Sequence, residues 1–372
     1  MPDCSLDGVG KGLCVRCLTH DDRHEEPTVT HPFADPADAP PIDHLMQLAS
    51  GFMASKVLLV AARVGLFTAL AEGPVSGDEL RDRLDLHPRS AHDFFDTLVA
   101  LGALERGTDG YRNAPAADYY LVRGRPAYAG GFLEMNDSRT YGLWGNLEAA
   151  LRSGEPQNGS TENDDGMYAH LYADPERLAV FQEAMTGLSM GSAHALAETF
   201  DWSPYRTVAD VGCAEGAVLT HLLHRHPHLH GIGFDLPAVA SGFRRRLDAS
   251  GLDERLDFWP GDFFAEPLPR ADVLILGHII SGFSRSKARS LLEKAYEALP
   301  AGGSLIVYES LLDDERKENV HGLLMSLTML LETPGGFEYT GPECQEWLAA
   351  TGFTESRVIH LSGPESMIVA VK

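Results

Sequence analysis

The stretch that most constrains the fold is 207–236, which reads TVADVGCAEGAVLTHLLHRHPHLHGIGFDL. A short apolar run at 207–211 precedes a glycine turn, a helical segment and a second apolar run that ends in Asp235. This order is typical of two parallel strands joined by a helix in an open α/β sheet. In such sheets ligands bind at the carboxyl ends of the strands, where an acidic residue typically holds the hydroxyls of a ribose. The stretch therefore predicts an α/β domain that binds a nucleoside-containing cofactor.

The glycine loop narrows the choice of cofactor. A dinucleotide site requires G-x-G-x-x-G, because the backbone must approach a pyrophosphate closely at a helix N-terminus. Here the loop at 212–216 reads GCAEG, so the middle glycine is absent and Glu215 would repel a pyrophosphate. A nucleoside without phosphates fits better, and the positively charged amino end of S-adenosylmethionine (SAM) would tolerate a nearby acid. Taken alone, the loop also allows a purely structural turn at Gly212 and Gly216.

Length and charge exclude several classes of protein. A chain of 372 residues can form two domains with separate cores. Its net charge of −24 disfavours nucleic acid or an anionic membrane as a partner, because both bind to a basic face. The sequence has no run of 18 or more apolar residues and no apolar signal-peptide core, so we expect no membrane span and a cytoplasmic protein.

The first residues carry a second, weaker pattern. Cys14 and Cys17 are spaced C-x-x-C, and His20 and His24 follow, which is a conceivable zinc knuckle. No partner pair follows at a standard distance, and 1–41 is rich in Asp, Pro, His and Gly without helical or strand periodicity. A disordered leader is the favoured interpretation of 1–41.

The segment 42–121 resembles a winged helix. An apolar helical pattern opens it, Ser76 and Glu79 form a candidate capping box, a helix is predicted over 90–101, and a hairpin turn is predicted at 109–110. DNA binding is the obvious reading of helix, helix and β-wing. The candidate recognition helix, however, carries two aspartates and no lysine or arginine. The charge therefore disfavours DNA binding and, with it, a transcriptional regulator.

Ordered blocks in the rest of the chain are specific in sequence and spacing. They read VADVGCAEG, GFDLP, PGDFF, ADVLILGHI, LPAGGSLIVYES, MLLETPGGFEYT and EWLAATGF. Over 42–372 the chain resembles the class I SAM-dependent methyltransferases, specifically the two-domain small-molecule O-methyltransferases of the acetylserotonin and caffeate type. The resemblance implies a dimerisation domain at 42–121, linking helices and a substrate-pocket wall at 122–202, and a catalytic Rossmann-like domain at 203–372. Strands at about 356–361 and 366–372 would complete a seven-stranded sheet, and the protein would be a homodimer.

The resemblance also assigns residues to SAM and to a small aromatic substrate. Asp262 would accept a hydrogen bond from the adenine amino group, Phe263 would cover the adenine ring, and Gly277 would offer only its backbone. The full set assigned to the cofactor is Asp210, Gly212, Gly216, Asp235, Leu236, Gly261, Asp262, Phe263 and Gly277. The set assigned to the substrate is Phe181, Met185, Ser326 and Met329, although apolar side chains at helical spacing are also typical of plain core. No metal-ligand cluster is recognised in the catalytic half.

One block departs from the family. Members usually read like H-I-L-H-D-W, with the second histidine as general base, whereas 278–283 reads HIISGF and places Ser281 at the base position. A serine hydroxyl is no base near neutral pH. General-base catalysis supplies about 10²–10⁴-fold in rate, so its loss costs about 3–5 kcal/mol of barrier lowering. The two acids that flank the base in the family are matched by Glu309, which could otherwise be a surface acid at a strand end, and Glu338.

Three accounts of Ser281 stay open. The enzyme methylates the oxygen of an acidic phenol, aided by proximity and with His278 as a substitute base. Alternatively, the acceptor is an aromatic carbon or an amine, or methyl transfer has been lost. We favour O-methylation of a phenolic metabolite. His170 and His321 are looser candidates for catalytic help, and a nicotinamide-dependent dehydrogenase is the competing enzyme class, which the loop at 212–216 disfavours.

Overall fold

The computed structural model describes residues 41–125, 127–159, 172 and 174–372. The predicted disordered leader, except for its last residue, lies outside the described residues, and so do its cysteine pair and His170.

The N-terminal part has helices followed by an antiparallel hairpin, as the winged-helix pattern predicts, and ends with one more helix. Its elements are α1 (Asp43–Arg63), α2 (Leu66–Ala69), α3 (Gly77–Arg83), α4 (Ala91–Ala100), β1 (Leu104–Gly107), β2 (Gly110–Asn113) and α5 (Pro115–Leu121). The first helix is shorter than its apolar pattern indicates, because Gly65 adopts a left-handed backbone with φ 74° and separates α1 from α2. The predicted capping box forms only by half. Ser76 accepts the N–H of Glu79 at 3.3 Å, but the Glu79 carboxylate binds Arg83 instead.

Helix α1 exposes an apolar surface. Leu45, Leu48 and Phe52 are each more than half exposed. With 21 residues, α1 is also the single helix in the described part of the chain that is long and apolar enough to cross a membrane. The sequence predicts no membrane span, because polar residues such as Lys56 interrupt the apolar residues of α1 and leave no unbroken apolar run. Exposed apolar surface of this kind is typical of a site of association.

The linking segment is helical, as expected. It contains α6 (Gly130–Met135), the π-helix η2 (Asn136–Thr140), α7 (Tyr141–Leu143), the 3₁₀ turn η3 (Trp144–Asn146), α8 (Leu147–Ser153) and α10 (Pro175–Thr199). Helix α10 packs against α6 and also against the catalytic half, so it connects the linking segment with the cofactor-binding part.

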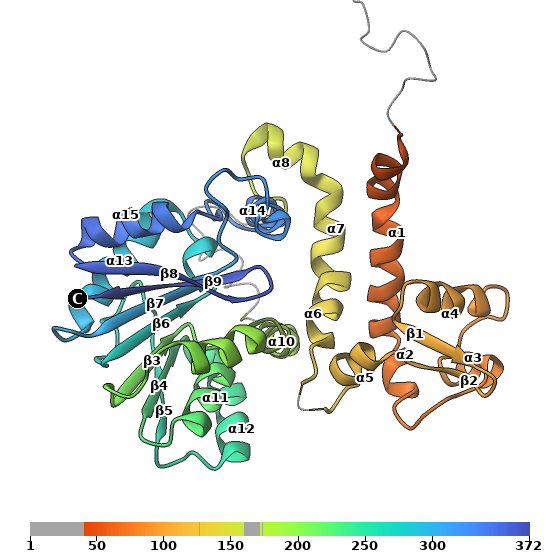
Figure 1. The fold of residues 1–372 in the computed structure, drawn as a ribbon, viewed down its shortest axis with the longest axis horizontal. Coiled ribbons are helices and arrows are strands. Elements are labelled where there is room, and N and C mark those ends of the chain that lie inside the picture. The colour runs from red at the N-terminus through yellow and green to blue at the C-terminus, as the bar shows by residue number, and fades with distance from the viewer. Residues whose placement is uncertain (1–40, 126, 160–171, 173) are drawn as a thin grey trace, which may run out of the picture. The chain divides into compact units, whose positions relative to one another are not determined.

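The predicted seven-stranded sheet is present (Figure 1). Its strands are β3 (Thr207–Val211), β4 (His230–Asp235), β5 (Leu256–Pro260), β6 (Val273–Gly277), β7 (Ser304–Glu309), β8 (Glu355–Ser362) and β9 (Glu365–Val371). The order is β5-β4-β3-β6-β7-β9-β8, and β9 alone runs antiparallel to its neighbours β7 and β8. The chain proceeds from β3 outward to β5 and then returns to β6 on the other side of β3. The carboxyl ends of β3 and β6 therefore meet at the topological switch point, where such sheets bind ligands.

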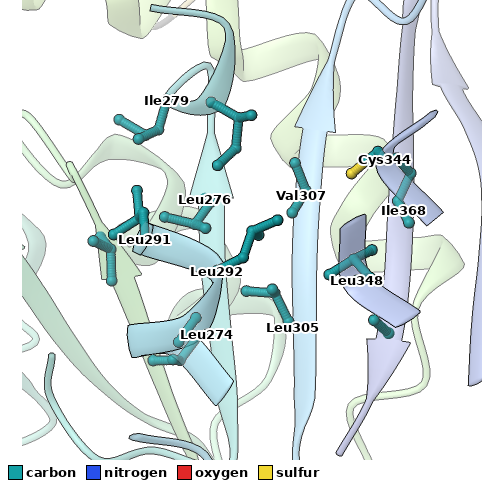
Figure 2. Close-up of a cluster of buried hydrophobic side chains, with 14 of the residues drawn as sticks. Leu274, Leu276, Ile279, Leu291, Leu292, Leu305, Val307, Cys344, Leu348 and Ile368 are labelled. Atoms are coloured by element: carbon teal, nitrogen blue, oxygen red, sulfur yellow. The ribbon is translucent and has the colours of Figure 1, made fainter. Parts of the chain in front are cut away.

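Helices cover both faces of the sheet. The helical segments of this half are α11 (Ala217–Arg225), η4 (Pro237–Val239), α12 (Ala240–Ser250), η5 (Ile280–Gly282), α13 (Arg285–Ala298), α14 (Val320–Glu332) and α15 (Gly341–Thr351). In β6, Val273 and Ile275 join the core with α10, α11 and α12. Leu274 and Leu276 point to the opposite core with α13 and α15, which Figure 2 shows around Leu292. Successive side chains of a strand alternate between faces, so two buried faces require the nearly continuous apolar runs in the sequence.

Candidate functional site

A cavity of about 420 Å³ opens at the switch point. It is bounded by the loops after β3, β4, β5 and β6 and by one side of α10. Most of the residues assigned to the cofactor line it, namely Asp210, Gly212, Asp235, Leu236, Asp262, Phe263 and Gly277. Gly216 and Gly261 do not, and close packing explains them. A Cβ at Gly216 would lie 2.5 Å from the ring of Phe243, and one at Gly261 would lie 2.6 Å from the ring of Phe234.

The loop after β3 brings its backbone to the cavity. Gly212 has φ 81°, and a Cβ there would lie 2.3 Å from Cδ1 of Ile279. Ala214 also has a positive φ of 48°, which is uncommon outside glycine. Its N–H donates to Oδ2 of Asp235 at 2.8 Å, while the N–H of Leu236 donates to Oδ1 at 2.7 Å. These two bonds fix the carboxylate at the end of β4, and each oxygen keeps a lone pair for a ligand.

Two buried acids face this cavity. Burial, and then the neighbouring Asp235, raise the pKa of Asp210 to about 7. Burial raises the pKa of Asp235 to about 6, against the lowering effect of its two backbone hydrogen bonds. A cationic ligand group near this pair would lower both pKa values and favour the charged carboxylates. The pair therefore suits a ligand that carries positive charge.

Glu215 does not act as the loop sequence indicated. Its carboxylate accepts the hydroxyl of Thr186 on α10 at 2.5 Å and forms an ion pair with Arg246 on α12. It does not line the cavity. Glu215 therefore does not repel a pyrophosphate as predicted, because Arg246 compensates its charge and Thr186 of α10 holds it away from the cavity. The loop still lacks the middle glycine of a dinucleotide site, and this absence continues to disfavour a pyrophosphate.

An aromatic group forms one wall of the cavity. The rings of Phe263 and Phe264 meet edge to face at 4.8 Å, and Phe283 meets Phe264 in the same way at 4.8 Å. Asp262 accepts the N–H of Phe264 at 2.8 Å, which fixes the loop after β5. Lys287 lies over the Phe264 ring, 5.3 Å from its centroid. Sequence reasoning found Asp262 and Phe263 but missed Phe283 and Lys287, because they come from the next loop and from α13.

Tyr308 is a further lining residue that sequence reasoning missed. A Cβ on Gly277 would lie 2.1 Å from the Tyr308 ring, so only glycine fits at this place beside the tyrosine. Burial is the main cause that raises the pKa of the Tyr308 hydroxyl, and the nearby Ser189 side chain on α10 lowers it. The signal was present in the sequence, since Tyr308 directly precedes Glu309 in the VYES block.

Ser281 and the two predicted acids lie behind the cavity rather than on its surface. None of the three is among the lining residues. Ser281 is buried in η5, and both its N–H and its hydroxyl donate to the Glu309 carboxyl, at 3.2 and 3.0 Å. Burial raises the pKa of Glu309 to about 8, and burial followed by repulsion from Glu309 and Glu365 raises the pKa of Glu338. At neutral pH the Glu309 carboxyl therefore favours its protonated form.

The acid cluster contains one member that sequence reasoning missed. Glu365, the first residue of β9, is 5% exposed and accepts the hydroxyl of Ser310. In the sequence it stands in a GPES turn, far from the other acids, and resembles an ordinary surface residue. Within the described ranges no group of histidine, cysteine, aspartate or glutamate side chains could hold a metal ion.

His278 reaches both the cavity and the acid cluster. It lines the cavity and its side chain is 18% exposed. Its Nδ1 lies 3.8 Å from Oε2 of Glu309, and its Nε2 lies 3.6 Å from Oε2 of Glu365. Of the side chains assigned to catalysis, His278 is the one that the structure places at the cavity surface.

The four residues assigned to the substrate divide into two pairs. Phe181 and Met185 on α10 line the cavity. Ser326 and Met329 on α14 do not, and the Ser326 hydroxyl accepts the N–H of Glu338 at 3.3 Å. The structure therefore brings Phe181 and Met185 to the cofactor residues and places Ser326 beside the acid cluster.

Two family models match the chain. The O-methyltransferase domain matches residues 144–354, and the O-methyltransferase dimerisation domain matches residues 46–123. The second match contains most of α1.

Named proteins resemble the chain over most of its length. The tetracenomycin polyketide synthesis 8-O-methyl transferase TcmO of Streptomyces glaucescens is 41% identical, over 88% of this chain and 96% of its own. The N,N-dimethyltransferase OxyT of Streptomyces rimosus is 37% identical, again over 88% of this chain and 96% of its own. The crystal structure of human N-acetylserotonin methyltransferase in complex with SAM superimposes with a TM-score of 0.83 and 28% identity, covering 92% of this chain and 99% of that one.

Proposed function

Because this chain belongs to the family of SAM-dependent O-methyltransferases that carry a dimerisation domain, we propose that it methylates a hydroxyl group of a small aromatic compound. The observation that supports this most directly is the cavity at the switch point. There the fixed carboxylate of Asp235, the bare backbone at Gly212 and Gly277 and the apolar side chains of Phe181 and Met185 meet in one space.

The lining residues fit SAM. Asp235 would hold the ribose hydroxyls, Asp262 and Phe263 would receive the adenine, and the backbone beside Gly212 would hold the amino acid part. The two buried acids, Asp210 and Asp235, suit a ligand with positive charge, as their raised pKa values indicate. When bound, SAM supplies a methyl group on a positively charged sulfur, and the sulfur keeps the electron pair of the broken bond.

The acceptor would enter between α10 and the loops after β5 and β6. Phe181 and Met185 offer apolar surface, and a thioether adapts to irregular shapes. Such walls suit the flat faces of an aromatic ring system. The residues of this site would orient the acceptor hydroxyl and exclude water. Holding two reactants in line contributes much of the rate of a transfer of this kind.

N-methylation is a second candidate, and the acid cluster favours it. Glu309, Glu338 and Glu365 are buried together with no lysine or arginine paired to any of them among the described residues. A substrate ammonium near this cluster would favour the ionised forms of these carboxyls and be stabilised by them, and OxyT bears the name of an N,N-dimethyltransferase. O-methylation is favoured because both matching family models describe O-methyltransferase domains.

The test is the transfer of labelled methyl from SAM to matched pairs of naphthols and naphthylamines, with each product located by mass spectrometry. Calorimetric titration with SAM and with NAD should precede it. The proposal predicts binding of SAM, no binding of NAD, and label on oxygen. Label on nitrogen would favour N-methylation over O-methylation. Binding of NAD instead of SAM would refute both.

The dimerisation domain leads us to propose a homodimer that pairs through α1. Leu45, Leu48 and Phe52 expose apolar side chains on this helix, inside or next to the segment that the dimerisation model matches. Surfaces of this kind on a soluble chain mark a site of association.

A further inference from the structure

The backbone holds His278 in one orientation. His278 directly follows β6 and has φ 55°, an uncommon value for a residue other than glycine. Its N–H donates to the carbonyl oxygen of Tyr308 at 3.1 Å, and the two rings meet edge to face with centroids 5.1 Å apart. A non-glycine residue keeps such a conformation only where its surroundings impose it, and such residues are frequent at functional sites.

The two ring nitrogens of His278 have different surroundings. Nε2 is fully buried, so the 18% of the side chain that is exposed belongs to its other atoms. Nε2 has no hydrogen-bond partner among the described residues, and Oε2 of Glu365 has none either. These two buried atoms face each other at 3.6 Å. A buried polar atom without a partner is costly, so a closure of a few tenths of an ångström into an N–H···O bond would be favourable.

We propose that Glu365 is a positioning residue that keeps a proton on Nε2 of His278, so that Nδ1 is the atom that takes the proton of the substrate hydroxyl. The proposal rests on the proposed function. In the reaction the O–H bond of the acceptor breaks as its oxygen forms the new bond to the methyl carbon. The proton joins the lone pair of Nδ1, and it passes to water after the product leaves. His278 then supplies the general base that Ser281 cannot supply.

The charges around His278 agree with this role. Burial is the main cause that lowers its pKa, Glu365 raises the pKa, and His321 on α14 lowers it. The neutral imidazole, which can accept a proton, is therefore the resting form at neutral pH. Glu309 also faces the ring, 3.8 Å from Nδ1, and the Tyr308 ring meets it edge to face. Once the imidazole is protonated, its positive charge favours the ionised form of Glu309, and that carboxylate then stabilises the imidazolium.

The test reads the tautomer directly. Nitrogen NMR of the full-length protein labelled in histidine, bound to S-adenosylhomocysteine, reports which ring nitrogen carries the proton, and His278→Gln identifies the signal. The proposal predicts the Nε2–H tautomer in the wild type. Glu365→Gln, which keeps an acceptor but removes the charge, should lower the pKa of His278 by about one pH unit. Glu365→Met removes both the acceptor and the charge, and His278 should then also lose its preference for the Nε2–H tautomer.

A matched control separates this effect from general damage. Glu332→Gln removes another buried carboxyl, one that pairs with Arg139 at 2.9 Å, and should leave the His278 signal unchanged. An Nδ1–H tautomer in the wild type would overturn the proposal even if neither Glu365 variant folds. An unchanged His278 pKa in Glu365→Gln, or an equal change in Glu332→Gln, would do the same.

The pH profile of methyl transfer gives a second readout. The probes are two naphthols whose hydroxyl groups differ in pKa. The pH at which kcat falls on the acidic side should be the same for both naphthols, and it should be lower in Glu365→Gln than in the wild type. A fall whose pH follows the hydroxyl pKa would mean that no residue accepts the proton, which overturns the proposal. The NMR result holds whether or not either naphthol is methylated, so failure of the proposed function and failure of this proposal are distinguished.

Discussion

Replacement of Glu309 by glutamine should make the protein less sensitive to alkaline pH. Glu309 is 1% exposed, and its pKa is raised from the ordinary value of 4.5 to about 8, first of all by burial. The folded protein therefore binds a proton more tightly at this carboxyl than the unfolded chain does. Stability from this group is complete below about pH 4.5, falls as the pH rises, and is lost above about pH 8.

The magnitude follows from the size of the shift. One pKa unit corresponds to about 1.4 kcal/mol, which sets an upper bound of about 5 kcal/mol for this carboxyl. Relaxation and water penetration reduce the penalty of a buried charge, so we expect about 2–4 kcal/mol between pH 5 and pH 8. Glutamine has nearly the same shape. Its carbonyl oxygen can accept the N–H of Ser281 and its amide can donate to the Ser281 hydroxyl, so both contacts persist.

The assay is thermal unfolding of the wild type and Glu309→Gln at a series of pH values from 5 to 8.5. For a chain of this length the difference in Tm should grow in favour of the variant by about 3–5 °C over that range. The exposed Glu254→Gln serves as the control for loss of a surface carboxyl. A Tm difference that stays constant with pH would refute the reasoning, because Glu309 would then be ionised and compensated in the folded protein.

Three further predictions concern the cofactor, the cavity wall and the dimer. Asp235→Ala removes the carboxylate that two backbone N–H groups fix, and calorimetry should show SAM binding weakened by at least about tenfold; equal affinity would disprove the ribose assignment. Gly277→Ala places a methyl group against the Tyr308 ring and should lower both Tm and SAM affinity, whereas a variant with wild-type Tm would mean that the ring moves freely. Phe52→Asp puts a charge on the exposed apolar surface of α1 and should yield monomers by analytical ultracentrifugation; an intact dimer would place the interface elsewhere.

Much of the fold could be predicted from local sequence patterns. The strand bounds at 207–211 and the strand end at Asp235 agree with the structure, and the last two strands complete the sheet as expected. Strands that are buried on both faces need apolar residues at nearly every position, so their pattern survives without knowledge of their neighbours. Asp235 stands at the carboxyl end of β4, as predicted, and it lines the cavity.

The predictions that were wrong concern residues whose contacts come from distant parts of the chain. Glu215 was interpreted as facing a ligand, but α10 and α12 supply Thr186 and Arg246 to bind it. Gly216 belongs to the same loop as Gly212, yet it serves the packing of Phe243 rather than the cavity. Spacing within one loop does not determine which side of the loop a helix from elsewhere will cover.

The sequence by itself determined the α/β sheet and the acid at the carboxyl end of β4, because strand periodicity, turn glycines and a strand-end acid are local properties. Only the tertiary structure decided which groups surround His278. Strand β9 enters antiparallel beside β7 and begins at the edge of the sheet where the parallel strands end. Its first residue, Glu365, is thereby buried next to an imidazole from the loop after β6. Burial and proximity, which set the protonation of these groups, arise from the packing of distant segments and have no local signal in the chain.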